Sequence, residues 1–189
     1  ASLDQLEAEL PNVTRVNLVV AWFGNDLRCG ECLVRPGVEI ADKVTVPHAW
    51  SVAGVERDDA YVVSATEGRP NYGGTPSDIS VRQAIAALKA RGFHVTLYPF
   101  LLMDVPVGNG LPDPYGGAEQ AAFPWRGRIT AAGGGVGAQV DAFFARYRDF
   151  IVHYAGIADE EGADGILIGS ELVALTRLAD GDAYPAVDA

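Results

Sequence analysis

The sharpest chemical signal in the sequence is a carboxylate that follows an apolar run. Residues 166–169 are apolar apart from a closing glycine, and Glu171 comes one serine later. A side chain directly after a buried strand lies at the C-terminal edge of a parallel sheet, where barrel enzymes have their active sites. We therefore predict that Glu171 is a catalytic general acid. The alternative is that Glu171 lies in the first turn of a helix, where the helix dipole favours an acidic side chain.

Aromatic and polar side chains gather where the other apolar runs end. Flat aromatic faces stack on sugar rings, and carboxylates, amides and guanidinium groups bind sugar hydroxyls. Core packing explains Tyr98 equally well, and solvated loop positions explain the acidic residues. The residues that we expect to bind substrate are Trp22, Asn25, Asp26, Tyr98, Asp104, Trp125 and Arg126.

Several other site classes lack their sequence signature. A dinucleotide or P-loop site needs a glycine-rich turn directly after a strand, and a serine hydrolase needs G-x-S-x-G. A structural zinc site needs about four ligands, but the only C-x-x-C pair is Cys29 and Cys32 and the histidines are scattered. These cysteines are a loop disulfide or two free thiols, with redox chemistry as a third reading. We expect no metal and no cofactor.

The elements that must position these residues alternate along the chain. Apolar residues at helical spacing predict helices over residues 76–91 and 138–160. Thr75 is the expected N-cap of the first helix. Strands apolar on both faces are predicted at 16–23, 60–64, 94–103 and 164–169, and such strands between amphipathic helices indicate a parallel sheet covered by helices. The fold class is α/β.

The loops of this sheet are long on one side only. Helix-to-strand links are short, whereas residues 24–60 and 104–137 leave strand ends as long irregular segments. Functional residues of α/β folds lie on loops of this kind. Counted in order, the predicted strands are numbers one to four, and Glu171 follows the fourth.

Composition removes two classes of partner. With 14 basic and 25 acidic residues, the 189-residue chain has a formal charge of -11. Nucleic-acid binding rests on lysine and arginine, so no nucleic-acid partner is expected. No apolar run approaches the length of about 20 residues that a membrane span needs.

Three word-like motifs resemble one known family. They are residues 69–78 (RPNYGGTPSD), 98–106 (YPFLLMDVP) and 124–130 (PWRGRIT). Together they resemble the TIM-barrel-like domain of gene transfer agent and phage-tail host-specificity (baseplate hub) proteins from alphaproteobacteria. The resemblance runs from Val16 to about Leu178, and the family is distantly similar to retaining (β/α)8 glycoside hydrolases. It implies the N-terminal part of such a barrel, about four β/α units, in one domain over residues 1–189 that is incomplete at its C-terminus.

The resemblance also implies a function. Residues 168–172 (IGSEL) match the fourth-strand motif that carries the acid/base glutamate, which is Glu171 here. The nucleophile of such enzymes follows the seventh strand and has no counterpart in this chain. The implied activity is that of a retaining glycosidase acting on cell-surface or cell-wall glycan as a particle enters a cell. The implied partners are glycan and other tail or baseplate proteins, and the implied location is the particle tail. The alternative is a catalytically inactive structural or carbohydrate-binding module of the tail.

Overall fold

The computed structural model describes residues 2–188, and its main sheet is built on two long parallel strands. β1 (Arg15–Gly24) and β9 (His94–Met103) pair along all ten residues, from Arg15 opposite His94 to Gly24 opposite Met103. β10 (Gly165–Ile166) adds a third parallel strand at the far edge of β9. β2 (Val34–Arg35) pairs antiparallel with the last two residues of β1, so the order is β10-β9-β1-β2.

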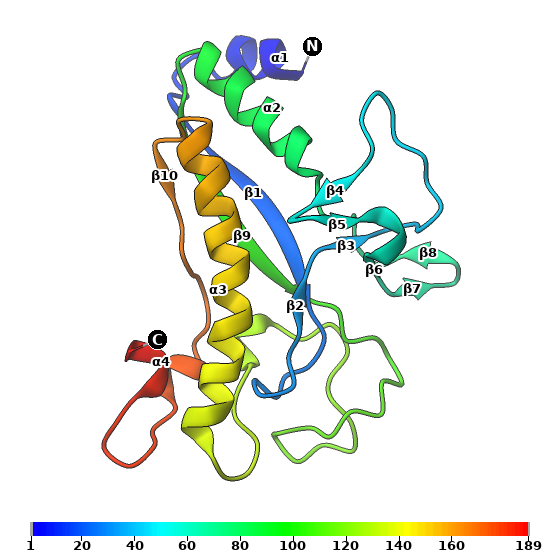
Figure 1. Cartoon of the computed structure of the whole chain (residues 1–189), viewed down its shortest axis with the longest axis vertical. Helices are drawn as coiled ribbons and strands as arrows, with labels where there is room; N and C mark the ends of the chain where they lie inside the picture. The colour runs from blue at the N-terminus through cyan, green and yellow to red at the C-terminus, as the bar shows by residue number, and fades with distance from the viewer. Residues whose placement is uncertain (1, 189) are drawn as a thin grey trace.

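Two helices cover one face of this sheet, as Figure 1 shows. They are α2 (Asp78–Ala90) and α3 (Val136–Glu160). Alternate residues of β9, such as Val95 and Leu97, are fully buried in the same core cluster as Ile85 of α2 and Phe150 of α3. The intervening side chains, Tyr98 among them, are only half-buried on the opposite face. Parallel strands with helices packed on one face of the sheet confirm the predicted α/β class.

The strand count differs from the prediction at residues 60–64. Within that segment, β6 (Tyr61–Val62) pairs with β3 (Gly37–Val38) in a separate small sheet. It cannot lie between β1 and β9 because those two strands bond to each other along their whole length. Glu171 therefore follows the third parallel strand of the described sheet, and the count of four is corrected.

The segment between β1 and α2 folds into short paired strands instead of a barrel unit. Besides β3 and β6 these are two hairpins, which lie to the right of the sheet in Figure 1. The elements are β4 (Ser51–Val52), β5 (Val55–Glu56), η1 (Arg57–Asp59), β7 (Ala65–Thr66) and β8 (Arg69–Pro70).

The start of α2 is capped by a residue other than the expected one. Ser77 is the N-cap and accepts a hydrogen bond from the backbone N–H of Ser80. Thr75 is engaged elsewhere, because its hydroxyl donates to the carbonyl of Ala21 and accepts from the N–H of Gly37. The tertiary contacts of Thr75 thus move the helix start to Asp78, two residues after the predicted one.

The remaining elements lie at the ends of the chain and in the loop after β9. α1 (Ser2–Glu9) is tied to the end of α2, since Asp4 and Glu7 both pair with Arg91. The others are η2 (Arg126–Arg128), η3 (Leu175–Arg177) and α4 (Pro185–Asp188). Within the described range, no helix is both long and apolar enough to cross a membrane.

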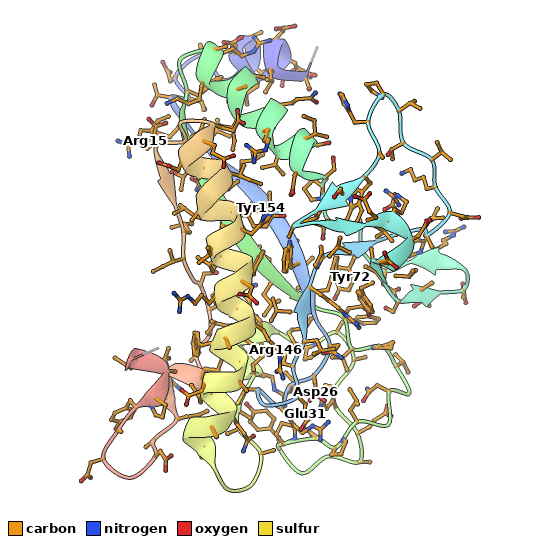
Figure 2. The ribbon with its side chains drawn as sticks, in the orientation of Figure 1. Arg15, Asp26, Glu31, Tyr72, Arg146 and Tyr154 are labelled. Carbon is orange, nitrogen blue, oxygen red and sulfur yellow. The ribbon has the colours of Figure 1, made fainter. Side chains whose placement is uncertain are left out.

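The two cysteines are free thiols in the core. Both side chains are fully buried, and burial raises the pKa of Cys32 to about 12 and also raises that of Cys29. Arg146 of α3 bonds to the carbonyls of Gly30 and Cys32 and holds this turn; it lies near Glu31 in Figure 2. The disulfide reading is thereby excluded for this structure.

We expect both thiols to be unreactive toward Ellman's reagent at pH 8 in the folded chain. The thiolate is the reactive species, and a buried thiol with a raised pKa supplies almost none of it. Two thiols per chain should react after unfolding in guanidinium, and Cys29→Ser should reduce that count to one. Rapid reaction of the folded chain would contradict the burial of this pair.

Candidate functional site

Glu171 lies beyond β10 at the end of the sheet where β1 and β9 also finish. Its backbone φ is 60°, in the left-handed region. For a residue with a side chain this conformation costs about 1–2 kcal/mol, and such strain persists only where surrounding contacts maintain it. The Glu171 side chain is 51% exposed, so substrate can reach it from solvent.

One oxygen of the Glu171 carboxylate is held by two donors. The indole Nε1 of Trp125 donates to Oε2 at 2.5 Å. The Nη2 of Arg126 lies 3.1 Å from the same oxygen. Within residues 2–188, no hydrogen bond reaches Oε1. The carboxylate therefore has one bound oxygen and one open oxygen.

Arg126 is itself buried and anchored to the sheet. Its side chain is 5% exposed, and the guanidinium carbon lies 3.6 Å from the centre of the Phe100 ring on the inner face of β9. The Nε and Nη2 atoms donate to the backbone carbonyl and the hydroxyl of Ser170 at 3.1 and 2.9 Å. The Ser170 hydroxyl also bonds to the Tyr98 hydroxyl. These contacts link β9, η2 and the residue that precedes Glu171.

Trp125 rests on a glycine. A Cβ atom at Gly127 would lie 2.4–2.6 Å from the indole ring of Trp125, closer than real atoms approach. The φ angle of Gly127 is not positive, so its backbone conformation is open to other residues. The close contact with the Trp125 ring is what requires a glycine there. The Trp125 ring remains half-exposed, with its N–H directed at Glu171.

Small-molecule sites typically have volumes of about 300–1,000 Å³. A cavity of about 760 Å³ borders Glu171. Its walls come from α3 and from the segment around Glu171 and Leu172, and they include Phe144, Tyr147 and Ile151. Burial raises the pKa of Tyr147 to about 12, so this hydroxyl stays protonated at neutral pH. The cavity has room for a sugar ring beside the carboxylate.

The structure places Trp22 in the core. The side chain is 5% exposed, stacks on Phe150 of α3 and donates from Nε1 to the hydroxyl of Tyr154 at 3.2 Å. Figure 2 shows Tyr154 between α3 and the sheet. Trp22 thus joins the sheet to its covering helix, on the face opposite Tyr98.

The predicted polar residues after β1 are used inside their own loop. Asp26 is buried and accepts hydrogen bonds from Arg28 and Gln120. Asn25 accepts from the backbone N–H of Leu33. Both residues therefore stabilise the loop after β1. Among the described residues, no hydrogen bond joins either of them to Glu171.

Asp104 is also buried, at the end of β9. It accepts from the Tyr61 hydroxyl and from both the N–H and the hydroxyl of Ser64. Burial raises the pKa of Tyr61 well above its usual value, and the hydrogen bond to Asp104 adds to that effect. Asp104 therefore fixes the β6 segment on the strand end.

Of the predicted site residues, the structure brings together Glu171, Trp125, Arg126 and Tyr98. Two members of this cluster were missed from the sequence, Ser170 and Gly127. Both lie within quoted motifs, IGSEL and PWRGRIT, and their small side chains gave no chemical signal. Their roles depend on bonds and close approaches across the fold.

A comparison with protein families finds one match in the part of the chain that contains Glu171. Residues 145–189 match the GTA TIM-barrel-like domain. The resemblance to this family is confirmed. The matched segment covers less of the chain than the motifs indicated, and includes IGSEL but none of the three word-like motifs.

Among solved structures, a similar one is described as the complex structure of a GH113 β-1,4-mannanase. It has a TM-score of 0.52 and 17% identity, and the match covers 92% of this chain. The same match covers 40% of the mannanase chain, so this chain spans less than half of its length. The chain therefore has the fold of part of a TIM barrel. No curated protein matches the sequence significantly.

Proposed function

We propose that this chain is part of a glycoside hydrolase-like barrel in which Glu171 gives a proton to a glycosidic oxygen. The proposal is carried by the Glu171 carboxylate, which lies at the strand ends with Oε2 bound and Oε1 open. The cavity beside it and the strained backbone of Glu171 add support. Strain of this kind clusters at active sites.

A retaining mechanism requires a second carboxylate about 5–5.5 Å from the first, to attack the anomeric carbon. We propose that this nucleophile comes from a part of the barrel outside this chain. The glycan would be a cell-surface or cell-wall polymer that a tail-like particle meets, with other tail proteins as neighbours. The family match and the barrel fold are the basis for this assignment.

The test is glycan cleavage by the complete protein that contains this chain. Unmodified protein and Glu171→Gln are incubated with purified cell wall, capsular glycan and β-1,4-mannan, and released reducing ends are measured. We expect Glu171→Gln to lose at least about 100-fold in turnover, the usual contribution of a general acid. Binding of the same glycans should persist, because the amide keeps the shape of the side chain.

Glu31→Gln is the matched control, because Glu31 is exposed and takes no part in the contacts around Glu171. It should cleave at the unmodified rate. Equal turnover by Glu171→Gln would overturn the assignment of Glu171. Binding without cleavage by the unmodified protein would instead support a carbohydrate-binding module.

A further inference from the structure

We propose that Trp125, Arg126 and Gly127 form a positioning segment that binds Oε2 of Glu171 and leaves Oε1 as the oxygen that exchanges a proton with substrate. The second half of this inference rests on the proposed function, and the first half does not. The three residues are consecutive: Trp125 is the N-cap of η2, and Arg126 and Gly127 are its first two residues. The sequence had indicated substrate contacts for two of them.

The identity of the reactive oxygen follows from where the donors point. Trp125 and Arg126 both direct N–H groups at Oε2. Indole and guanidinium nitrogens are donors only, so neither can accept a hydrogen bond from a proton on Oε2. A protonated Glu171 in this arrangement therefore carries its hydrogen on Oε1. In the reaction, the O–H bond on Oε1 breaks as the leaving oxygen takes the proton and the electron pair of the glycosidic bond. The carboxylate that remains stays bound to the Arg126 cation.

The positions of the two donors are fixed independently of Glu171. Arg126 is held by Phe100 and by two hydrogen bonds to Ser170, as described above. A buried guanidinium whose Nε and Nη2 atoms are already bound has little freedom to follow a substrate. We therefore assign Arg126 a positioning role that acts through Glu171 and Ser170.

The glycine at position 127 fixes the second donor. Because the indole ring lies where a Cβ atom would be, alanine at position 127 must displace the ring by several tenths of an ångström or more. The carbonyl of Gly127 also accepts from the N–H of Ala174, three residues after Glu171. Gly127 therefore links the position of the indole ring with the segment that carries Glu171.

The indole N–H signals in an NMR spectrum of the 189-residue chain test the positioning without any activity. The chain has three tryptophans, and Trp125→Phe identifies the third signal by removing it. We expect Glu171→Ala and Gly127→Ala each to move the Trp125 signal upfield, because both break the bond to Oε2. The Trp22 and Trp50 signals should stay in place, since those N–H groups donate to Tyr154 and Thr75.

Gly156→Ala is the matched glycine control. Gly156 lies in α3 with no atom within 4 Å of an added Cβ and no positive φ, so its substitution should leave all three signals unchanged. If the Trp125 signal does not respond to Glu171→Ala or to Gly127→Ala, the positioning role is refuted.

Kinetics of the complete protein then separate positioning from substrate binding. Trp125→Phe keeps an aromatic face but removes the N–H donor together with the five-membered ring of the indole. We expect kcat to fall about tenfold with KM unchanged, because a charge-assisted hydrogen bond is lost from the reacting group. A raised KM with normal kcat would overturn the inference in favour of sugar stacking. If the unmodified protein cleaves nothing, the proposed function fails, and the NMR result alone decides the positioning role.

Discussion

Glu171→Ala in the complete protein is expected to slow cleavage of glycosides with poor leaving groups at least about 100-fold, and to slow dinitrophenyl glycosides far less. An alkyl or sugar alkoxide leaves only when it is protonated, whereas a dinitrophenolate leaves as a stable anion. The loss should therefore depend on the basicity of the leaving oxygen. This dependence distinguishes a missing proton donor from a damaged fold, which would slow both substrates equally.

The measurement is kcat/KM for a series of aryl glycosides that differ only in leaving-group acidity. The unmodified protein should show a shallow dependence and Glu171→Ala a steep one. Glu31→Ala, at an exposed position, should match the unmodified series. An equal loss across the whole series in a folded Glu171→Ala protein would exclude proton donation by Glu171.

The second large effect concerns stability. Asp104→Ala should lower the free energy of unfolding by about 3–5 kcal/mol, because three donors lose a charged acceptor inside the protein. The side chain is 1% exposed, so water does not replace the lost bonds without rearrangement. A loss of this size is a large share of the stability of about 5–15 kcal/mol that domains have. Urea unfolding followed by circular dichroism measures it.

Two variants test the reason for this loss. Asp104→Asn should cost about 1 kcal/mol, since its carbonyl can still accept from Tyr61 and Ser64 and the Ser64 hydroxyl can accept from its amide. Asp42→Ala, at an exposed turn position, should leave the unfolding curve in place. Wild-type stability in Asp104→Ala would show that the contacts to the β6 segment carry no net energy.

The sequence was sufficient for the fold class and for the main helices. Helical periodicity predicted α3 closely, and runs of buried residues predicted β1 and β9, because the side-chain period of a buried element is a local property. It was not sufficient for the segment at 60–64. That run has the composition of a strand, and it pairs with β3. It does not join the main sheet between β1 and β9, because those strands bond to each other along their whole length.

The candidate site divides in the same way. Residue type and position after a strand pointed to Glu171, and the motif around Trp125 and Arg126 marked them as functional. Their relation to one another spans more than 40 residues, from η2 to the segment after β10, and no local pattern encodes it. Likewise, burial separated Trp22, Asp26 and Asp104, which hold the fold together, from Glu171, which is open to solvent.

By itself, then, the sequence determined an α/β chain with an acidic residue at a strand end, because periodicity and residue chemistry are written along the chain. Only the tertiary structure decided that two donors bind one oxygen of Glu171 and leave the other open. It also decided that Gly127 is needed for the space it leaves to Trp125. The physical reason is that hydrogen bonds and close packing join residues distant in sequence, and their geometry exists only once the sheet, η2 and the segment after β10 have come together.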